Sequence, residues 1–355
     1  MSSKQIVRLN FIHLNSSLPK FLIQNVNRCS ALFPEIEIEL VTDQDEGLRS
    51  LVSDNLVIQP YKRVEMTSRL LERMTHKRNF RSDFWRVSIE RIIALLELVI
   101  QDNIPRLHIE SDMLLLQDFS FRWIMESRKP MWCKYSLDRD SAAMMFVPDK
   151  ESATRLLQLV YKQLESNPSH TDMSILRSIA KNRSIEFDYF PTCEDSTDEI
   201  IVERARVIPW QVLSDKNEKL PAVLDSAAFG MWITGQDTRN NLGLLILHEN
   251  FAHLKILTNP DSYTYSLHGN GSHLVLSKEE KSYALVSLHV HSKELGLFSI
   301  NNKNYLQYYL QLAKRINTIR LFRPNLFLGF LREGLSNGSL IRTLAFIIRN
   351  KLQSK

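Results

Sequence analysis

Residues 107–116 read LHIESDMLLL, an apolar run that two carboxylates, Glu110 and Asp112, interrupt. In a β-strand, residues i and i+2 point to the same face, so this strand would present both carboxylates together where it ends. Carboxylate oxygens in such an arrangement suit a divalent cation. A strand that ends in an ordinary polar turn explains the same residues, and the rest of the chain has to decide between the two interpretations.

The sequence before this stretch alternates strands and helices. Apolar, β-branched runs at 5–14, 36–42 and 56–58 predict strands, and helical spacing predicts a helix over 21–33. A short polar helix is expected between the second and third strands. The order β-α-β-α-β favours a parallel sheet of the nucleotide-binding type, which binds its ligands at the carboxyl ends of its strands.

The longest periodic helix is predicted over residues 79–101, directly before the acidic stretch. Arg91 lies within its apolar stripe, and a contact with a buried partner is one of two explanations for it. Because the helix returns the chain to the sheet, Glu110 and Asp112 should follow a buried strand at the ligand-binding edge. This context favours the cation site.

Two later segments carry residues that suit a ligand site. Residues 225–240, DSAAFGMWITGQDTRN, are rich in small residues, so the backbone near Gly230 can approach a ligand closely, although a tight structural turn explains them equally well. Residues 282–293, SYALVSLHVHSK, predict a strand that places His289 and His291 on one face. Helices are expected over 150–183 and from residue 304 onward.

Composition describes an ordinary globular protein. The 355 residues are 24% charged and 44% hydrophobic, and the chain is long enough to bury a substantial core. Its three cysteines are widely spaced and form no CxxC pair, which is typical of reduced cysteines in a cytosolic protein. No secretory signal or bilayer-length apolar run is found, so a cytoplasmic location is expected.

Positive charge is concentrated at the C-terminal end. Residues 313–355 carry nine basic side chains and one acidic one, a net +8, so the rest of the chain must be about −3 to give the overall +5. Apolar residues alternate with these basic ones, which suggests peripheral contact with an anionic membrane surface on its cytoplasmic side. A helical subdomain with a solvated basic face explains the pattern equally well.

Taken in order, these landmarks resemble the GT-A glycosyltransferases. The resemblance rests on the βαβ opening, the SDFWR sequence at 82–86, the acidic pair at 110 and 112, the DSAAFGMWITG segment at 225–235 and HVHSK at 289–293. It covers roughly residues 5 to 300, and the order of the motifs is more specific than any one of them. Glu-Ser-Asp stands here where the family commonly has Asp-x-Asp.

The resemblance implies an α/β fold of the GT-A type, with a Rossmann-like, mostly parallel central sheet flanked by helices. Residues 1–300 would form the catalytic domain, and residues 301–355 a basic, mostly helical extension. The implied activity moves a sugar from a nucleotide-sugar donor to a saccharide or lipid-linked acceptor, in surface polysaccharide or glycoconjugate synthesis. Mn²⁺ or Mg²⁺ would stabilise the diphosphate leaving group.

The resemblance also implies a set of metal ligands. Asp112 would bind the cation directly, and Glu110 would reach it through water or contact the donor ribose. A late histidine often completes such a site, and His291 is preferred to His289 for this role. Lys293, which follows on the same strand face, would meet a phosphate.

Further donor-binding residues are expected on the elements that precede the acidic stretch. Asp83 and Arg86 match a Ser-Asp-x-x-Arg helix start near the donor, although two residues three apart on a helix can equally pair with each other. Arg91, His13 and Asp43 are the other candidates on these elements, and Gly230 is a candidate on the small-residue segment. His13 is explained as well by packing in the core or at the surface.

The catalytic base, and the activity itself, each leave alternatives open. An inverting reaction needs a carboxylate to deprotonate the acceptor, for which Asp225 and Asp237 are candidates, whereas a retaining reaction needs none. The sequence pI of about 9.0 raises the alternative of a nucleic-acid-binding protein that acts through its basic tail, but the body has no recognised RNA or DNA motif, so no nucleic-acid partner is expected. A catalytically silent GT-A-like scaffold is the third possibility.

Overall fold

The computed structural model describes most of the chain up to residue 230 and a smaller part after it. The described residues are 7–44, 48, 51, 53–75, 83–136, 138–192, 206–207, 210–213, 219–230, 262–268, 273–291 and 295. The predictions for Asp237, Lys293 and the extension at 301–355 lie outside these residues.

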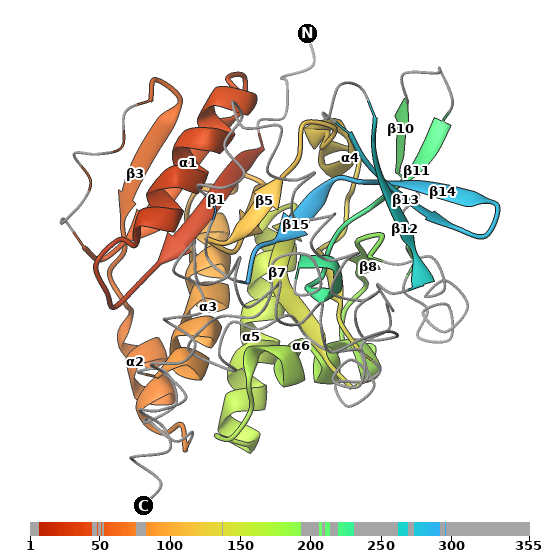
Figure 1. Cartoon of the computed structure of the whole chain (residues 1–355). Coiled ribbons are helices and arrows are strands. Elements are labelled where there is room, and N and C mark those ends of the chain that lie inside the picture. Colours follow the sequence, from red (N-terminus) through yellow and green to blue (C-terminus); the bar gives the residue numbers. More distant parts are fainter. Residues whose placement is uncertain are drawn as a thin grey trace, which may run out of the picture.

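A mostly parallel sheet of eight strands forms the centre of the fold, in the order β3-β2-β1-β4-β7-β6-β8-β9 (Figure 1). The first four strands in this order are parallel, and β7 is antiparallel to both of its neighbours. The chain runs from β1 to β2 on one side, whereas β4 lies on the other side of β1. The strand order therefore reverses between β1 and β4, and their carboxyl ends form a topological switch point, where α/β sheets bind ligands. The strands are β1 Arg8–His13, β2 Glu37–Thr42, β3 Leu56–Pro60, β4 Arg106–Ile109, β6 Met131–Lys134, β7 Asp140–Val147, β8 Asp188–Tyr189 and β9 Arg206–Val207.

Helices cover both faces of this sheet, so the strands are apolar on both sides. On one face α1 packs Leu22 and Val26 against the strands, and on the other α3 forms a core together with α2, α5 and α6. α3 contacts both the sheet and α5, which explains why ten of its nineteen residues are buried. The helices are α1 Lys20–Leu32, α2 Glu65–Glu72, α3 Phe84–Asp102, α4 Phe121–Met125, α5 Lys150–Ser166 and α6 Asp172–Lys181.

Two smaller sheets complete the described structure. Five strands form one sheet in the order β10-β11-β14-β13-β12, and β5 and β15 form a two-stranded antiparallel ladder. Phe229 and Leu288 lie in a third core, which these two sheets share. The ladder brings the late part of the chain against the end of β4. The strands are β5 Met113–Leu115, β10 Gln211–Leu213, β11 Lys219–Val223, β12 Thr264–His268, β13 His273–Lys278, β14 Lys281–Leu285 and β15 Ser287–His289.

The sequence prediction of a mixed α/β fold with a mostly parallel central sheet is confirmed, but several elements differ from it. Residues 107–116 do not form one strand, because Met113 N–H donates to Glu110 O at 2.9 Å and a turn separates β4 from β5. Residues 282–293 likewise divide between β14 and β15, and the described residues between β2 and β3 form no α-helix. None of the helices in the described ranges is long and apolar enough to cross a membrane.

Candidate metal and donor site

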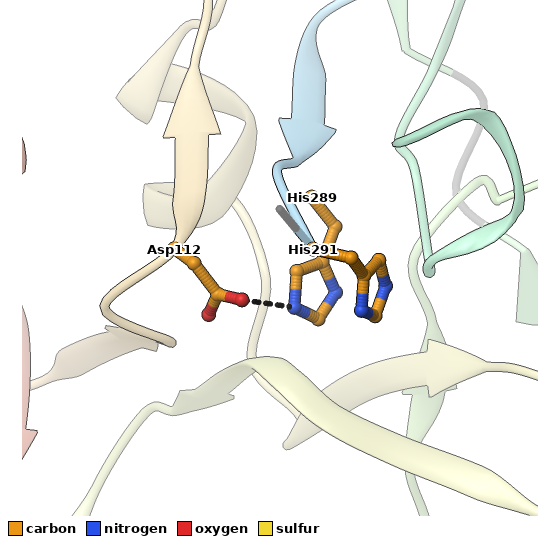
Figure 2. A group of neighbouring side chains, drawn as sticks. All are labelled: Asp112, His289 and His291. Atoms are coloured by element: carbon orange, nitrogen blue, oxygen red, sulfur yellow. Dashed lines mark ion pairs between the residues drawn. The ribbon is translucent and has the colours of Figure 1, made fainter. Parts of the chain in front are cut away.

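Asp112, His289 and His291 come together at the carboxyl edge of the parallel strands. Figure 2 shows the Asp112 carboxylate pointing toward the two imidazole rings, and one potential ligand atom from each residue lies within 4.8 Å of the other two. Asp112 Oδ2 is 3.2 Å from His289 Nε2. Asp112 and His289 are buried and His291 is half-buried. Within the described residues, these three side chains form a group that could hold a metal ion.

The backbone of the β5–β15 ladder brings the histidines to this position. His289 lies opposite Met113, and Val290 N–H donates to Asp112 O at 2.8 Å, which fixes the register next to the carboxylate. His291 N–H donates to His289 O at 2.9 Å, a γ-turn that ends the strand. The ring centroids are 4.0 Å apart, whereas same-face neighbours in a strand are separated by about 6.6 Å along the backbone. The turn therefore concentrates two imidazoles beside Asp112.

Glu110 lies beside this group but is not one of its three members. Its Oε2 is 3.3 Å from His289 Nε2, and its Oε1 is 3.2 Å from Nη2 of Arg91 on α3. Arg91 also donates to Ser88 Oγ at 3.0 Å. Glu110, which is half-buried, therefore connects a histidine of the group to the Arg91 guanidinium, and the donor role of Arg91 stays a prediction.

His13 and Asp43 lie at the carboxyl ends of β1 and β2, next to the switch point. Asp43 accepts Asn15 N–H with both oxygens, at 2.9 and 3.1 Å, and Asn15 has a positive φ of 64°. His13 Nε2 is 3.1 Å from Ser17 O. Burial lowers the pKa of His13, and the nearby Arg91 contributes to the shift. His13 and Asp43 thus both hold the loop that follows β1. This loop lies at the carboxyl ends of the strands, where a ligand would bind.

Asp83 and Arg86, at the start of α3, form an ion pair of 2.8 Å with each other. This is the helix pairing that the sequence left open as the alternative to donor contact, and their donor role stays a prediction. Ser82, which begins the predicted motif, lies outside the described residues.

Gly230 makes a close backbone approach, but to the protein itself. A Cβ at this position would lie 1.8 Å from the carbonyl oxygen of His289, so no side chain fits there. The described part of the small-residue segment, residues 225–230, therefore forms a tight turn at Gly230, and the donor role of Gly230 stays a prediction. Its place next to His289 still connects it to the metal group.

Asp225 has the geometry of a backbone anchor, and its role as a base stays a prediction. Its Oδ1 accepts the N–H groups of Ala227 and Phe229 at 2.9 and 3.0 Å, and its Oδ2 accepts those of Gly230 and His289 at 2.6 and 2.9 Å. The side chain is fully buried. Burial raises the pKa of Asp225, and the hydrogen bonds from the backbone oppose the shift. Each of the two carboxylate oxygens therefore accepts two backbone N–H groups, which ties the residue to the turn and to His289.

Asp172, the first residue of α6, is a member of this region that the sequence analysis missed. Its side chain is buried, and Oδ1 has no hydrogen-bond partner within the described part of the chain. Burial and the Glu110 carboxylate raise the pKa of Asp172 to about 6, whereas Arg91 opposes the shift. An acidic residue in the first turn of a helix is ordinary because of the helix dipole, so no sequence pattern marks this environment.

Comparisons with known proteins identify no family for the chain. No family model matches the sequence, and no curated protein matches it. Solved structures similar to the chain include PaToxG glycosyltransferase, at 11% identity and a TM-score of 0.31, covering 50% of this chain and 72% of that one. They also include mouse xyloside xylosyltransferase 1 in its apo form, at 8% identity and a TM-score of 0.35, covering 57% of this chain and 94% of that one. Both neighbours are glycosyltransferases, but likeness at this level assigns no residue a role.

Proposed function

We propose that this chain is a metal-dependent glycosyltransferase that moves a sugar from a nucleotide-sugar donor to a saccharide or lipid-linked acceptor. The observation that carries the proposal is the group of Asp112, His289 and His291 at the carboxyl edge of the parallel strands. It stands at the end of β4, beside the β1–β4 switch point, where sheets of this kind bind nucleotides.

The chemistry of the three side chains fits a divalent cation. One carboxylate oxygen and two imidazole nitrogens suit Mn²⁺ better than Mg²⁺, because Mg²⁺ is a hard cation that takes oxygen ligands. Two histidines and a carboxylate also bind Zn²⁺ and Fe²⁺ in other proteins. When bound, the cation would stabilise the negative charge that develops on the diphosphate leaving group.

The surrounding residues orient this group and supply fixed charge. Glu110 lies 3.3 Å from His289 Nε2, so it restricts the orientation of that ring. In return, Glu110 and Ser88 hold the Arg91 guanidinium at the end of the sheet. In this proposal Arg91 provides a positive charge near the donor phosphates, and His13 and Asp43 shape the loop next to them.

The test measures nucleoside diphosphate release from a panel of nucleotide sugars with Mn²⁺ present. We expect release that EDTA abolishes, that excess Mn²⁺ restores, and that Asp112→Asn removes. Asp54→Asn is the matched control, because Asp54 is an exposed carboxylate outside the site and its loss should leave release unchanged. Failure to release diphosphate from any donor, or release that EDTA does not affect, would contradict the proposal.

Peripheral membrane contact through residues 313–355 is a separate part of the proposal, supported by their net charge of +8. It is tested by comparing the full chain with a chain that ends at residue 312 for binding to anionic and neutral liposomes. Equal binding of the two chains to anionic liposomes would remove this part and leave the transferase proposal intact.

A further inference from the structure

We infer that Asp225 is a positioning residue for the metal group, the three candidate ligands Asp112, His289 and His291. Its buried carboxylate ties the turn at 225–230 to the backbone of His289 and so holds both imidazoles toward Asp112. The inference rests on the proposed metal site. It gives Asp225 a role that does not depend on the predicted action of this residue as a base.

The hydrogen-bond pattern of the ladder explains why this tie is needed. Val290 N–H points into the ladder and donates to Asp112 O, so His289 N–H points to the opposite side, as alternation in an antiparallel pair requires. No strand pairs with β15 on that side among the described residues. Asp225 Oδ2 accepts this N–H at 2.9 Å and so supplies the acceptor that another strand would provide.

The same turn also fixes the carbonyl group of His289. Gly230 lies so close that a Cβ would meet His289 O at 1.8 Å, and Gly230 N–H donates to Asp225 Oδ2 at 2.6 Å. His291 N–H donates to the carbonyl at 2.9 Å. Both polar groups of the His289 backbone are therefore held, and the direction of its side chain follows from them.

β15 is too short to hold the histidines by itself. It has three residues and belongs to a two-stranded ladder, a unit that is only marginally stable without further support. Asp225 joins it to a buried turn through four N–H donors, one on the strand and three on the turn. Loss of an outer partner of a metal ligand typically weakens metal affinity about 10- to 100-fold.

The experiment compares two Asp→Asn substitutions in the full-length chain. Asp225→Asn keeps the size of the side chain, but its NH₂ group cannot accept the two N–H bonds that one carboxylate oxygen accepts. Asp140→Asn is the control for a loss of stability away from the metal group. Asp140 is also fully buried, accepts from Trp132 Nε1 at 3.0 Å and Tyr189 OH at 2.8 Å, and pairs with buried Lys134 Nζ at 3.2 Å. Calorimetric titration with Mn²⁺ should show about 10- to 100-fold weaker binding for Asp225→Asn and unchanged affinity for Asp140→Asn.

A measurement without metal separates this inference from the proposed function. Hydrogen exchange of the peptide covering residues 286–291 should be faster in Asp225→Asn than in the wild type, and unchanged in Asp140→Asn. If the wild type binds no Mn²⁺ but exchange of this peptide is still faster in Asp225→Asn than in the wild type, the metal proposal fails and the tie between Asp225 and His289 stands. Unchanged exchange together with unchanged Mn²⁺ affinity in Asp225→Asn would overturn the inference, as would equal weakening of affinity by both substitutions.

A milder variant keeps the inference testable if Asp225→Asn does not fold. Asp225 N–H donates to Ser287 Oγ at 3.1 Å, so Ser287→Ala loosens the same connection and retains the carboxylate. We expect faster exchange of residues 286–291 and weaker Mn²⁺ binding than in the wild type. Wild-type values for both would overturn the inference.

Discussion

Arg106→Met should cause a large loss of stability without affecting the candidate site. Arg106 and Glu39 each expose only 1% of their side chains, and Arg106 Nε and Nη2 lie 2.8 and 3.2 Å from the two carboxylate oxygens. Asn10 Nδ2 also donates to Glu39 Oε2, at 2.5 Å. This network joins β1, β2 and β4 near their amino ends, whereas Asp112 lies beyond their carboxyl ends.

The magnitude follows from what each change leaves buried. Arg106→Met leaves the Glu39 carboxylate without its main counter-charge, which typically costs about 3 to 5 kcal/mol. The partly exposed Asp102, which also pairs with Arg106, can be rehydrated and adds little. In the double variant Glu39→Leu/Arg106→Met no charge is stranded, and the Asn10 donor that loses its acceptor costs about 1 to 3 kcal/mol. The double variant should therefore be more stable than Arg106→Met alone.

Urea unfolding followed by tryptophan fluorescence measures these differences in the absence of metal. The control is Mn²⁺ affinity under native conditions, which should be the same in the wild type and in both variants. A loss of less than about 1 kcal/mol in Arg106→Met would show that Arg106 does not neutralise the buried Glu39. A loss in the double variant equal to the sum of the two single losses would show the same.

Three further substitutions test other parts of the structure. Because the pKa of Asp172 is raised to about 6, its stabilising contribution is present below the unfolded pKa and is lost as the pH rises through 6. Asp172→Asn should therefore raise the free energy of unfolding at pH 8 by up to roughly 3 kcal/mol, but not at pH 4. An equal change at both pH values would contradict the raised pKa. Gly230→Ala should weaken Mn²⁺ binding at least about 10-fold in a calorimetric titration, since its Cβ would overlap His289 O; wild-type affinity would show that the backbone can yield there. Glu110→Gln should weaken Mn²⁺ binding by about 10- to 100-fold without abolishing it, because Glu110 orients the His289 ring but lies outside the group of three. A loss as complete as that in Asp112→Asn would make Glu110 a direct ligand.

The elements that local patterns determine were predicted closely. The strands expected at 5–14 and 36–42 and the helix expected at 21–33 are present as β1, β2 and α1, with ends that differ by at most three residues. Their apolar spacing is a local property that needs no knowledge of distant partners. The order of these elements was also enough to predict the mostly parallel sheet.

Long-range pairing accounts for most of what the sequence did not reveal. The run at 107–116 looked like one strand because its apolar character continues on both sides of Glu110, but β5 leaves the main sheet to pair with β15, more than 170 residues later. Asp225 looked like a free carboxylate because backbone donors have no sequence signature. The γ-turn at His291 is equally invisible in a run of alternating residues, although the shared face of His289 and His291 was predicted.

The central sheet has an amino edge and a carboxyl edge, formed by the two ends of its parallel strands, and these differ in how they balance charge. This difference connects the stability prediction to the proposed function. At the amino edge, the Glu39 carboxylate meets the Arg106 guanidinium directly. At the carboxyl edge, within the described part of the chain, Arg91 pairs with Glu110 and lies near Asp172, and Asp112 contacts His289. A divalent cation would relieve the excess negative charge at that edge, so Mn²⁺ at 100 times its dissociation constant should add about 2.7 kcal/mol to stability. Because the two edges are separate, the loss caused by Arg106→Met should be the same with and without Mn²⁺, and a loss that depends on the metal would show that the edges are coupled.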